Sequence, residues 1–369
     1  MNPHQDSVKL RKIKHTHDPI SHQKSPSKND PFSRKSKKMK KSDEMKDEKE
    51  YPLLRFDELP EYMKDNEFIL NYYRADWPLK QAFFSLFHWH NETLNVWTHL
   101  IGFVVFVGLT IANMMHVPQV TEFLNILTWS FPLNQGASAS NYSIMDTPKL
   151  IDLRHGSPLD LDIDAPLMAA TRWPFFVFLA GAMFCLLSSS TCHLFGCHSH
   201  HLNLKLLQLD YVGIAVMIIT SFFPPIYYIF QCNPLWQFIY LGGVTTMGIF
   251  TIMTLLSPKL SSGKYRSFRA VLFMAMGLFG LIPSVHACIL KWDEPQRNAT
   301  LIYESVMALS YLTGTMFYVT RIPERWLPGW FDLAGHSHQI FHCFVIMGAL
   351  AHYGAAQLFI NSWGQAGCQ

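Results

Sequence analysis

Apolar residues gather into runs of about 20 from residue 95 onwards, which is the length that an α-helix needs to cross a bilayer. Polar and charged residues separate these runs, as they separate transmembrane helices. The runs cover residues 96–115, 173–195, 208–230, 234–256, 268–290, 301–320 and 338–360. We therefore expect an all-α membrane protein, a bundle of seven transmembrane helices.

The charges between the runs predict the orientation of the bundle. Loop 257–267 contains Lys and Arg without acids, and loop 321–337 adds two arginines. The long connection 116–172 is acidic instead. Lys and Arg are enriched in cytoplasmic loops, so the N-terminus is expected in the cytosol. An odd number of spans then places the C-terminus outside.

Glycosylation sequons agree with this orientation in part. Asn141 begins a sequon in the acidic connection, and Asn298 begins another in the loop expected before the sixth span, on the same outer side. A further sequon, at Asn91, would lie on the cytosolic side. Such short motifs often occur by chance, so they support the orientation without deciding it.

The first segment of the chain differs in composition from the rest. Residues 1–50 carry 14 Lys and Arg against 8 Asp and Glu and almost no aromatic residues, so they cannot bury enough apolar area to fold. We expect a disordered basic cytoplasmic tail, which either contacts anionic lipid or only sets the topology. No apolar stretch follows its charges, so the first span itself is expected to direct insertion. No nucleic-acid partner is expected.

Residues 51–95 form a segment of a third kind, rich in aromatic residues. Its stretch 79–89 is too short to span a bilayer, and its Phe and Trp content is typical either of a helix in the headgroup region or of a cap on the bundle. The segment ends in side chains that could anchor it to the bundle, namely Asn91, Glu92, Asn95 and Trp97. The membrane domain is expected to cover 96–360, and a C-terminal tail 361–369.

Five polar residues lie near one end of the expected spans. His338 and His342 are four residues apart, so both point to the same side of a helix at the start of span seven. Ser189 and His193 repeat this spacing at the end of span two, and Asp210 lies just inside span three. The expected topology brings all of them to the cytoplasmic end. Polar groups that border hydrocarbon are costly unless they pair or bind a metal, so we interpret this set as a functional site.

Histidines together with an acid favour a zinc site. A catalytic zinc takes three protein ligands and leaves a fourth position for water, and His193, His338 and His342 fit as ligands. Asp210 could hold or deprotonate that water, or orient an imidazole, and Ser189 could hydrogen-bond an oxyanion or the aspartate. The expected cofactor is Zn²⁺, with Asp210 and Ser189 as candidate catalytic residues.

The remaining histidines are expected to have structural roles. His336 is two positions from His338 on the helix and faces away from the pair. The loop expected after span two contains histidines that we expect to be solvated, namely His198, His200 and His201. Others lie on different helices or at another depth, where hydrogen bonds between helices are the expected role, namely His99, His286 and His352.

The cysteines give no sign of a disulfide framework. The chain has 7, which are scattered within or beside apolar helices rather than regularly spaced. Cys192 and Cys197 flank His193 and could ligate a metal, but small buried side chains of this kind more often only pack.

Several motifs resemble one known family. They are the runs Asn91 to Leu100, Ser189 to His193, Cys197 to Ser199, Leu209 to Ile214 and Ser337 to His342. These motifs resemble the progestin and adiponectin Q receptor (PAQR) family over roughly residues 55–360. The long connection 116–172 and the basic tail are most similar to the plant heptahelical transmembrane branch of that family.

The resemblance implies seven helices with the N-terminus inside and a zinc ion bound by His193, His338 and His342. It also implies an auxiliary role for Asp210 and Ser189. Animal members that resemble this chain are hormone receptors with proposed ceramidase activity, and the wider superfamily contains alkaline ceramidases. The 116–172 insertion is a departure from the animal pattern and alters the outer face.

Two functions fit these observations. One is a membrane receptor in hormone or stress signalling, in which a structural zinc clamps spans two, three and seven and the cytoplasmic face passes a signal to a partner. The other is a zinc-dependent lipid amidohydrolase of the ceramidase kind. A transporter is a weaker alternative, because no inverted repeat or paired broken helices are evident. We expect a multi-pass membrane protein whose partners are membrane lipid and a hormone or protein ligand.

Overall fold

The computed structural model describes residues 51–115 and 171–363. Within these ranges the chain is helical, and its one β-type pairing is an isolated bridge between Leu54 and Tyr73. Three of the expected features lie outside the described residues: the basic tail 1–50, the acidic connection up to residue 170 with Asn141, and the C-terminal tail from residue 364.

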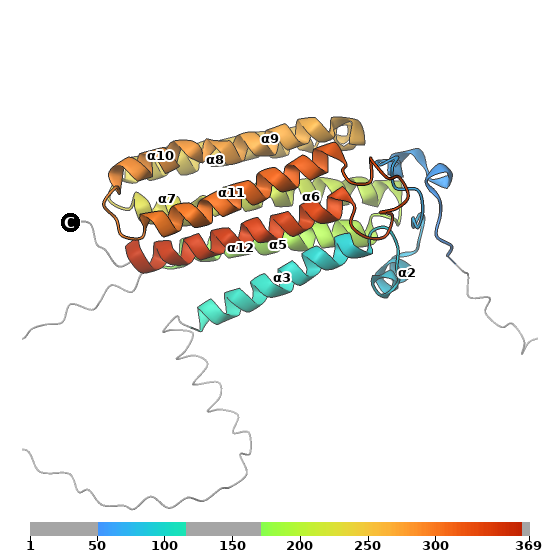
Figure 1. Cartoon of the computed structure of the whole chain (residues 1–369), viewed down its shortest axis with the longest axis horizontal. Helices are drawn as coiled ribbons and strands as arrows, with labels where there is room; N and C mark the ends of the chain where they lie inside the picture. The colour runs from blue at the N-terminus through green and yellow to red at the C-terminus, as the bar shows by residue number, and fades with distance from the viewer. Residues whose placement is uncertain (1–50, 116–170, 364–369) are drawn as a thin grey trace, which may run out of the picture. The chain divides into compact units, whose positions relative to one another are not determined.

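The long helices of the described part lie side by side as rods of one bundle (Figure 1). They are α3 (Thr93–Met114), α5 (Trp173–Phe195), α6 (His200–Ser221), α7 (Phe223–Ile229), α8 (Pro234–Leu255), α9 (Arg266–Phe279), α10 (Leu281–Leu290), α11 (Arg297–Thr320) and α12 (Ser337–Trp363). α7 continues the rod of α6, and α10 continues that of α9. Pro224 and Pro283 explain these two breaks, because proline has no N–H to bond the carbonyl four residues earlier.

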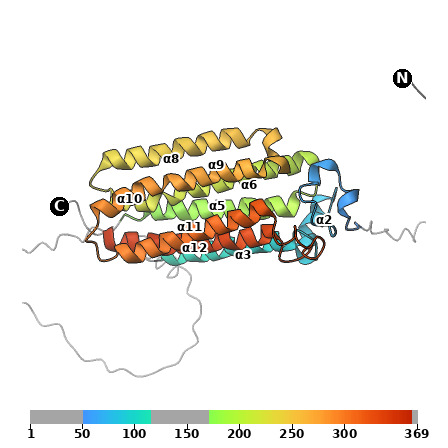
Figure 2. The same cartoon turned by 45° about the horizontal axis from the view of Figure 1, so that its top comes forward.

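The length and composition of the rods show a multi-pass membrane protein. Of the described rods, 6 are long and apolar enough to cross a membrane. The remaining rod, α11, is more polar and includes Glu304. It belongs to the same bundle, because it lies against α12 in both views (Figures 1 and 2). Gly348 permits this close contact, because a Cβ there would lie 2.7 Å from the ring of Tyr311. The predicted all-α, seven-helix fold is confirmed.

The starts of two helices, α6 and α11, lie furthest from the predicted ones. α6 begins at His200, with the hydroxyl of Ser199 capping its first turn. His200 and His201 therefore belong to a helix, and their prediction as loop residues was wrong. Asn298 lies in the first turn of α11, and Thr300 of the same sequon is buried, so this sequon is part of a helix rather than of a loop.

Large side chains fill the interior of the bundle. Phe106 of α3 and Phe178 of α5 meet edge to face, with ring centroids 6.2 Å apart, and both are fully buried. The outer surface is apolar as well: Phe238 and Phe250 on α8 are 77% and 66% exposed. An outer surface of this kind suits hydrocarbon rather than water.

Residues 51–77 and loop 321–336 lie together over the end of the bundle at which α3 and α12 begin (Figure 1), and we call this layer the cap. Asp65 of the cap forms a 2.6 Å ion pair with Arg266 at the start of α9. Asp332 accepts hydrogen bonds from a backbone N–H and an asparagine side chain of the first segment, at 2.9 and 2.8 Å. These contacts join the two parts of the cap and attach it to the bundle.

The short helix predicted between residues 79 and 89 is present. It consists of α2 (Leu79–Phe84) and the 3₁₀ turn η3 (Ser85–Phe87), and α2 contacts α5. Large aromatic side chains in and just after this helix are exposed, namely Phe83, Phe87 and Trp89. Exposed aromatic side chains are what the headgroup region accommodates, and the placement of the helix there stays a prediction.

Candidate metal centre

His193 lies in the last turn of α5, where the helix ends beneath the cap. Carbonyl groups at a helix C-terminus lack partners within the helix. The buried guanidinium of Arg74 donates to the carbonyls of His193 at 2.8 Å and Leu194 at 3.1 Å. A cation at this position also interacts favourably with the helix dipole. Arg74 therefore fixes the end of α5 and the backbone of His193.

His338 and His342 lie in the first two turns of α12, and Glu324 of the cap fixes the start of that helix. Its carboxylate is fully buried and accepts hydrogen bonds from the Ser337 backbone N–H, at 2.7 Å, and from the Ser337 hydroxyl. A carboxylate here satisfies a helix N–H that has no partner within the helix and interacts favourably with the dipole. The spacing of four residues then places both imidazoles on one face of α12.

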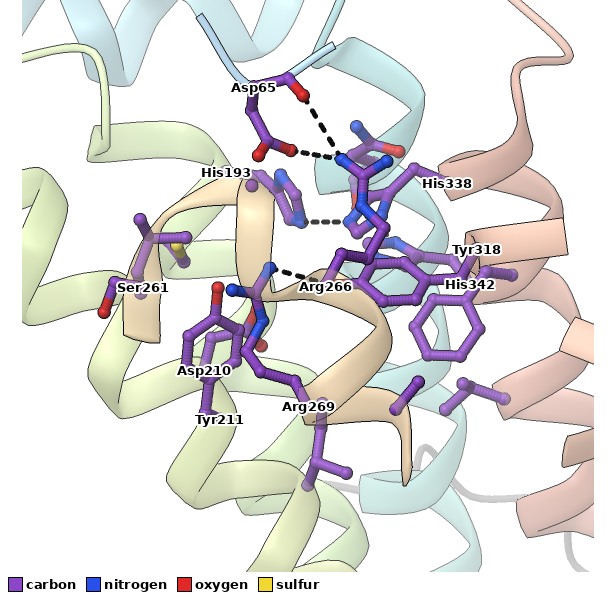
Figure 3. Close-up of a pocket in the computed structure, with 18 of the residues that line it drawn as sticks. Asp65, His193, Asp210, Tyr211, Ser261, Arg266, Arg269, Tyr318, His338 and His342 are labelled. Carbon is purple, nitrogen blue, oxygen red and sulfur yellow. Dashed lines mark hydrogen bonds and ion pairs between the residues drawn. The ribbon is translucent and has the colours of Figure 1, made fainter. Parts of the chain in front are cut away.

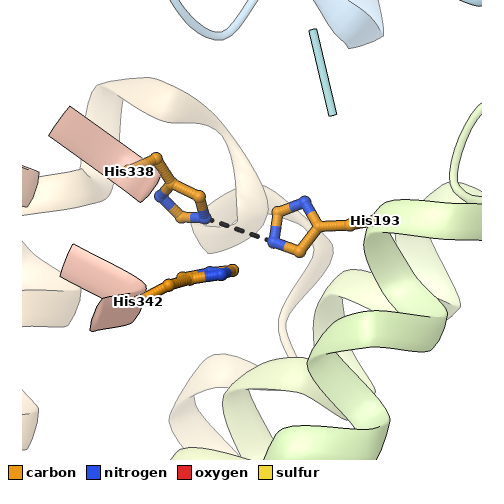
Figure 4. Close-up of side chains that lie close together, drawn as sticks. All are labelled: His193, His338 and His342. Atoms are coloured by element: carbon orange, nitrogen blue, oxygen red, sulfur yellow. Dashed lines mark hydrogen bonds between the residues drawn. The ribbon is translucent and has the colours of Figure 1, made fainter. Parts of the chain in front are cut away.

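The three imidazoles converge between α5 and α12 (Figure 4). Nε2 of His193 lies 3.2 Å from Nε2 of His338. The ring of His342 completes the group, with its centroid 5.0 Å from that of His193 and 4.7 Å from that of His338. One ligand nitrogen from each ring lies within 4.8 Å of the other two. No other such group of potential metal ligands occurs among the residues that the structure describes.

Hydrogen bonds on the far side of two rings fix their orientation. Nδ1 of His193 donates to Oε2 of Glu92 at 2.7 Å, and Nδ1 of His342 donates to the backbone carbonyl of Asn95 at 3.2 Å. Both acceptors lack a proton to give, so the proton of each ring belongs on Nδ1. In the neutral form of each ring, this tautomer leaves Nε2 free to bind a metal at the centre. Ligating histidines generally donate their second ring N–H in this way.

Glu92 is a charged partner of this group. Burial by itself would raise the pKa of Glu92, but the neighbouring His193 and a 2.6 Å hydrogen bond from the Asn95 amide lower the pKa below its ordinary value. Glu92 and Asn95 thus contact the candidate metal ligands, a role that we did not predict for them.

Trp97 does anchor the preceding segment as expected, because its indole N–H donates to a carbonyl in η3 at 2.9 Å.

The donor set fits a zinc ion. Imidazole nitrogens lie about 2.0–2.1 Å from Zn²⁺, so two of them at a tetrahedral angle are about 3.3 Å apart. The 3.2 Å between the Nε2 atoms of His193 and His338 agrees with that spacing. Three nitrogen ligands from the protein also match the catalytic sites that leave a fourth position open.

Asp210 lines the same cavity as the three imidazoles but does not belong to the converging group. The hydroxyl of Ser189 hydrogen-bonds to its carboxylate. Ser189 is itself buried and does not line the cavity, so its place supports contact with the aspartate rather than with a bound oxyanion. The close approach of α5 and α6 requires Gly213, where a Cβ would lie 2.4 Å from the Ser188 hydroxyl.

A cavity of about 580 Å³ opens beside the imidazoles (Figure 3). Its walls near the site are polar: Arg269 donates to the Tyr318 hydroxyl at 3.1 Å and lies 4.9 Å from the ring centre of Tyr211. Farther from the site the lining is apolar and comes largely from α9 and α11, with Phe273, Met274, Met307 and Leu312. The shape suits an amphipathic molecule whose polar part lies at the imidazoles.

Other histidines follow their predicted roles only in part. His286 and His352 make hydrogen bonds between helices, to a tyrosine at 2.9 Å and to a glutamate at 3.0 Å, which confirms that prediction. For His99 the prediction was wrong. Its ring stacks on that of His342 at a centroid distance of 3.6 Å, and neither nitrogen has a hydrogen-bond partner among the described residues.

Residues flanking the centre do not join it. His336 is outside the converging group, as predicted, but it is buried and lines the cavity. His198 bonds a backbone carbonyl of the cap at 2.9 Å instead of being solvated. Cys192 and Cys197 are buried free thiols outside the group. Cys232, in the turn between α7 and α8, is disulfide-bonded.

Comparison with known proteins identifies the family. A family model described as haemolysin-III related matches residues 87–353, which include the five polar residues singled out above. The chain belongs to this haemolysin-III-related, or PAQR, family. The match begins just before Glu92 and so also includes the histidine-orienting residues at the start of α3.

Individual relatives place this PAQR chain in the plant heptahelical branch. Heptahelical transmembrane protein 1 of Arabidopsis thaliana is 56% identical over 316 residues, covering 86% of this chain and 83% of the relative. Heptahelical transmembrane protein ADIPOR1 of Oryza sativa subsp. japonica is 54% identical over 333 residues, 87% of each chain. The adiponectin receptor protein of Drosophila melanogaster is 33% identical over 308 residues, 83% of this chain and 59% of the relative. The predicted family and branch are confirmed.

Proposed function

We propose that this PAQR protein is a membrane receptor in hormone or stress signalling, built around a zinc ion held by His193, His338 and His342. The observation that carries the metal site is the convergence of three imidazoles, two of which are oriented by hydrogen bonds on their far side. The receptor role is supported by similarity to a Drosophila protein named as an adiponectin receptor.

The proposed ion would join helices that are far apart in the sequence. Its ligands come from α5 and α12, and Glu92 and Asn95 add the start of α3. A metal bound there would stabilise one arrangement of these helices. The cap contacts the same helix ends, so a rearrangement at the site would reach the surface of the cap, where we propose that a signalling partner binds.

We also propose that the cap faces the cytosol. Basic residues gather at the cap end, including Lys264, Arg321 and Arg325, as is typical of cytoplasmic loops. The disulfide-bonded Cys232 lies at the opposite end, and disulfides persist in oxidising compartments outside the cytosol. This orientation places the N-terminus in the cytosol and the C-terminus outside.

A second candidate function is a zinc-dependent lipid amidohydrolase of the ceramidase kind. The observation that favours it is Asp210, a buried carboxylate that shares a cavity with the three imidazoles. A bound zinc ion would supply Lewis acidity towards an amide carbonyl. Asp210 would accept a proton from water while Ser189 holds its carboxylate in place. The apolar walls from α9 and α11 would hold an acyl chain.

A comparison of variants in cells without their own PAQR proteins separates the two functions. The triple variant His193→Ala, His338→Ala, His342→Ala removes the proposed ligands, and Asp210→Asn keeps them. A receptor with a structural zinc loses its response to the hormone or stress only in the triple variant. A signal that depends on hydrolysis is lost in both. A normal response from the triple variant, at equal membrane levels, would contradict the zinc-centred receptor.

A further inference from the structure

A second, smaller cavity lies beside the cap, outside the candidate metal centre. It measures about 280 Å³ and is formed by the start of α9, the end of α11 and the two parts of the cap. Its polar lining consists mostly of cationic and hydroxyl-bearing side chains, namely Lys264, Arg266, Ser267, Thr320, Arg321 and Arg325, with one acid, Glu67.

The charges of this cavity do not balance. Arg266 pairs with Asp65 at 2.6 Å, and Arg321 pairs with Glu67. Lys264 and Arg325 are exposed, and neither has an ion pair or a side-chain hydrogen bond within the described ranges 51–115 and 171–363. Two unpaired cations therefore face one small concave space. Such a space favours an anion that carries about two negative charges.

The cavity also lies where a membrane surface is expected. The membrane-length stretch that contains α9 begins at Gly263, so Lys264 marks the polar boundary of that span. One helical turn farther along are Phe268 and Val271, which are 43% and 55% exposed and apolar. Within α9, Val271 is four residues after Ser267, so these two residues share one side of the helix. The polar cavity therefore adjoins an apolar side of α9 that can contact lipid acyl chains.

We propose that this cavity binds the headgroup of an anionic phospholipid that carries a phosphate monoester, with Lys264 and Arg325 as its cationic contacts. The acyl chains of that lipid lie along the exposed apolar side of α9. Exposed Trp326 and Trp330 on the adjacent cap loop suit the same interfacial level. Basic pockets at the ends of membrane helices are known to bind headgroups of this class.

The proposed lipid site adjoins the cavity of the metal centre. Gly263 and Arg266 line both spaces. A headgroup would therefore lie beside the ion pairs of Arg266 and Arg321, which hold the cap across the end of the bundle. The site does not depend on the proposed function of the metal centre, because Lys264 and Arg325 do not line the cavity that contains the three imidazoles.

The test uses the full-length protein in phosphatidylcholine nanodiscs, titrated with a phosphatidylinositol phosphate. The double variant Lys264→Gln, Arg325→Gln removes the two unpaired charges and leaves both ion pairs intact. A matched control, Lys80→Gln, Lys259→Gln, removes the same charge from exposed residues outside the cavity. Equal thermal midpoints and metal contents show that both variants are folded.

We expect the dissociation constant for the lipid to rise about tenfold or more in the double variant, because each basic residue near an anionic headgroup adds to the binding affinity. The control is expected to bind like the wild type. Unchanged binding by the double variant, or an equal loss in the control, would overturn the proposed site. Inorganic phosphate is the second probe: displacement of the lipid at similar concentrations would assign the cavity to a soluble phosphate and overturn the lipid assignment.

Discussion

Nδ1 of His193 donates a 2.7 Å hydrogen bond to the carboxylate of Glu92, which precedes it by 101 positions in the chain. The bond selects the ring tautomer that leaves Nε2 free to bind a metal. It also fixes the angle at which the ring faces the other two imidazoles. Residues that orient a metal ligand in this way commonly change metal affinity by a factor of about 10–100 when they are replaced.

Replacement of Glu92 tests this relationship. Glu92→Gln keeps the size of the side chain but removes its charge, so we expect zinc affinity to fall by about 10–100-fold. Competition with a zinc-binding dye on purified protein measures the change. Glu61→Gln, at an exposed carboxylate of the cap, is the matched control. Equal affinities for Glu92→Gln and wild type would show that the carboxylate does not support the ligand.

Asp210→Asn tests the hydrolase candidate. The amide keeps an oxygen that accepts a hydrogen bond from Ser189 but cannot take up a proton. If the protein is a hydrolase, ceramide turnover in proteoliposomes should fall by at least about 10²-fold, the lower range of general acid–base catalysis, with an unchanged zinc content. Asp293→Asn, at an exposed position before α11, should have no effect. Absence of turnover by the wild type at several acyl lengths and pH values would argue against hydrolysis and leave the structural zinc.

Gly213→Ala tests the contact that brings α5 and α6 together at the site. The added Cβ would lie 2.4 Å from the Ser188 hydroxyl and 3.1 Å from the Cα of Cys185, so something must move. We expect the free energy of unfolding to fall by about 1–3 kcal/mol, the usual effect of overpacking. Thermal denaturation in detergent measures it. Gly108→Ala is the control, because no atom lies within 4 Å of its Cβ position, and a loss of similar size there would refute the explanation.

Labelling of single introduced cysteines tests the orientation. Ser262→Cys lies at the cap end, and Gln296→Cys lies at the opposite end, before α11; both positions are exposed. In intact cells a membrane-impermeant maleimide should label Gln296→Cys, whereas Ser262→Cys should react only after permeabilisation. The unmodified protein gives the background from its own thiols. The reverse pattern would place the cap outside.

Local patterns in the sequence explain which parts of the structure could be predicted. Helices and their spacing depend on nearby residues, so the spans and the shared face of His338 and His342 follow from periodicity. Contacts between segments that are far apart in the sequence leave no such periodic pattern. Arg74 fixes the end of α5 from about 120 residues away. Its sequence neighbours do not reveal that role.

His99 is a second residue whose contact partner could not be predicted from the sequence. Its position within an apolar run indicated burial correctly, but not its partner. A hydrogen bond between helices was expected, and the structure instead stacks its ring on that of His342. The sequon at Asn298 was likewise assigned to a loop, because the polar residues at the start of α11 resemble those of a connection. In the structure that stretch is instead the first turn of α11.

Metal content tests the central claim most directly. Purified wild-type protein should contain one zinc ion per chain by elemental analysis, because three imidazoles converge once among the described residues. The variant His193→Ala, His338→Ala, His342→Ala should contain none. A control with three histidines replaced elsewhere at the cap end, His88→Ala, His200→Ala, His201→Ala, should keep the ion. Unchanged zinc in the first variant, or none in the wild type, would contradict the proposed metal centre.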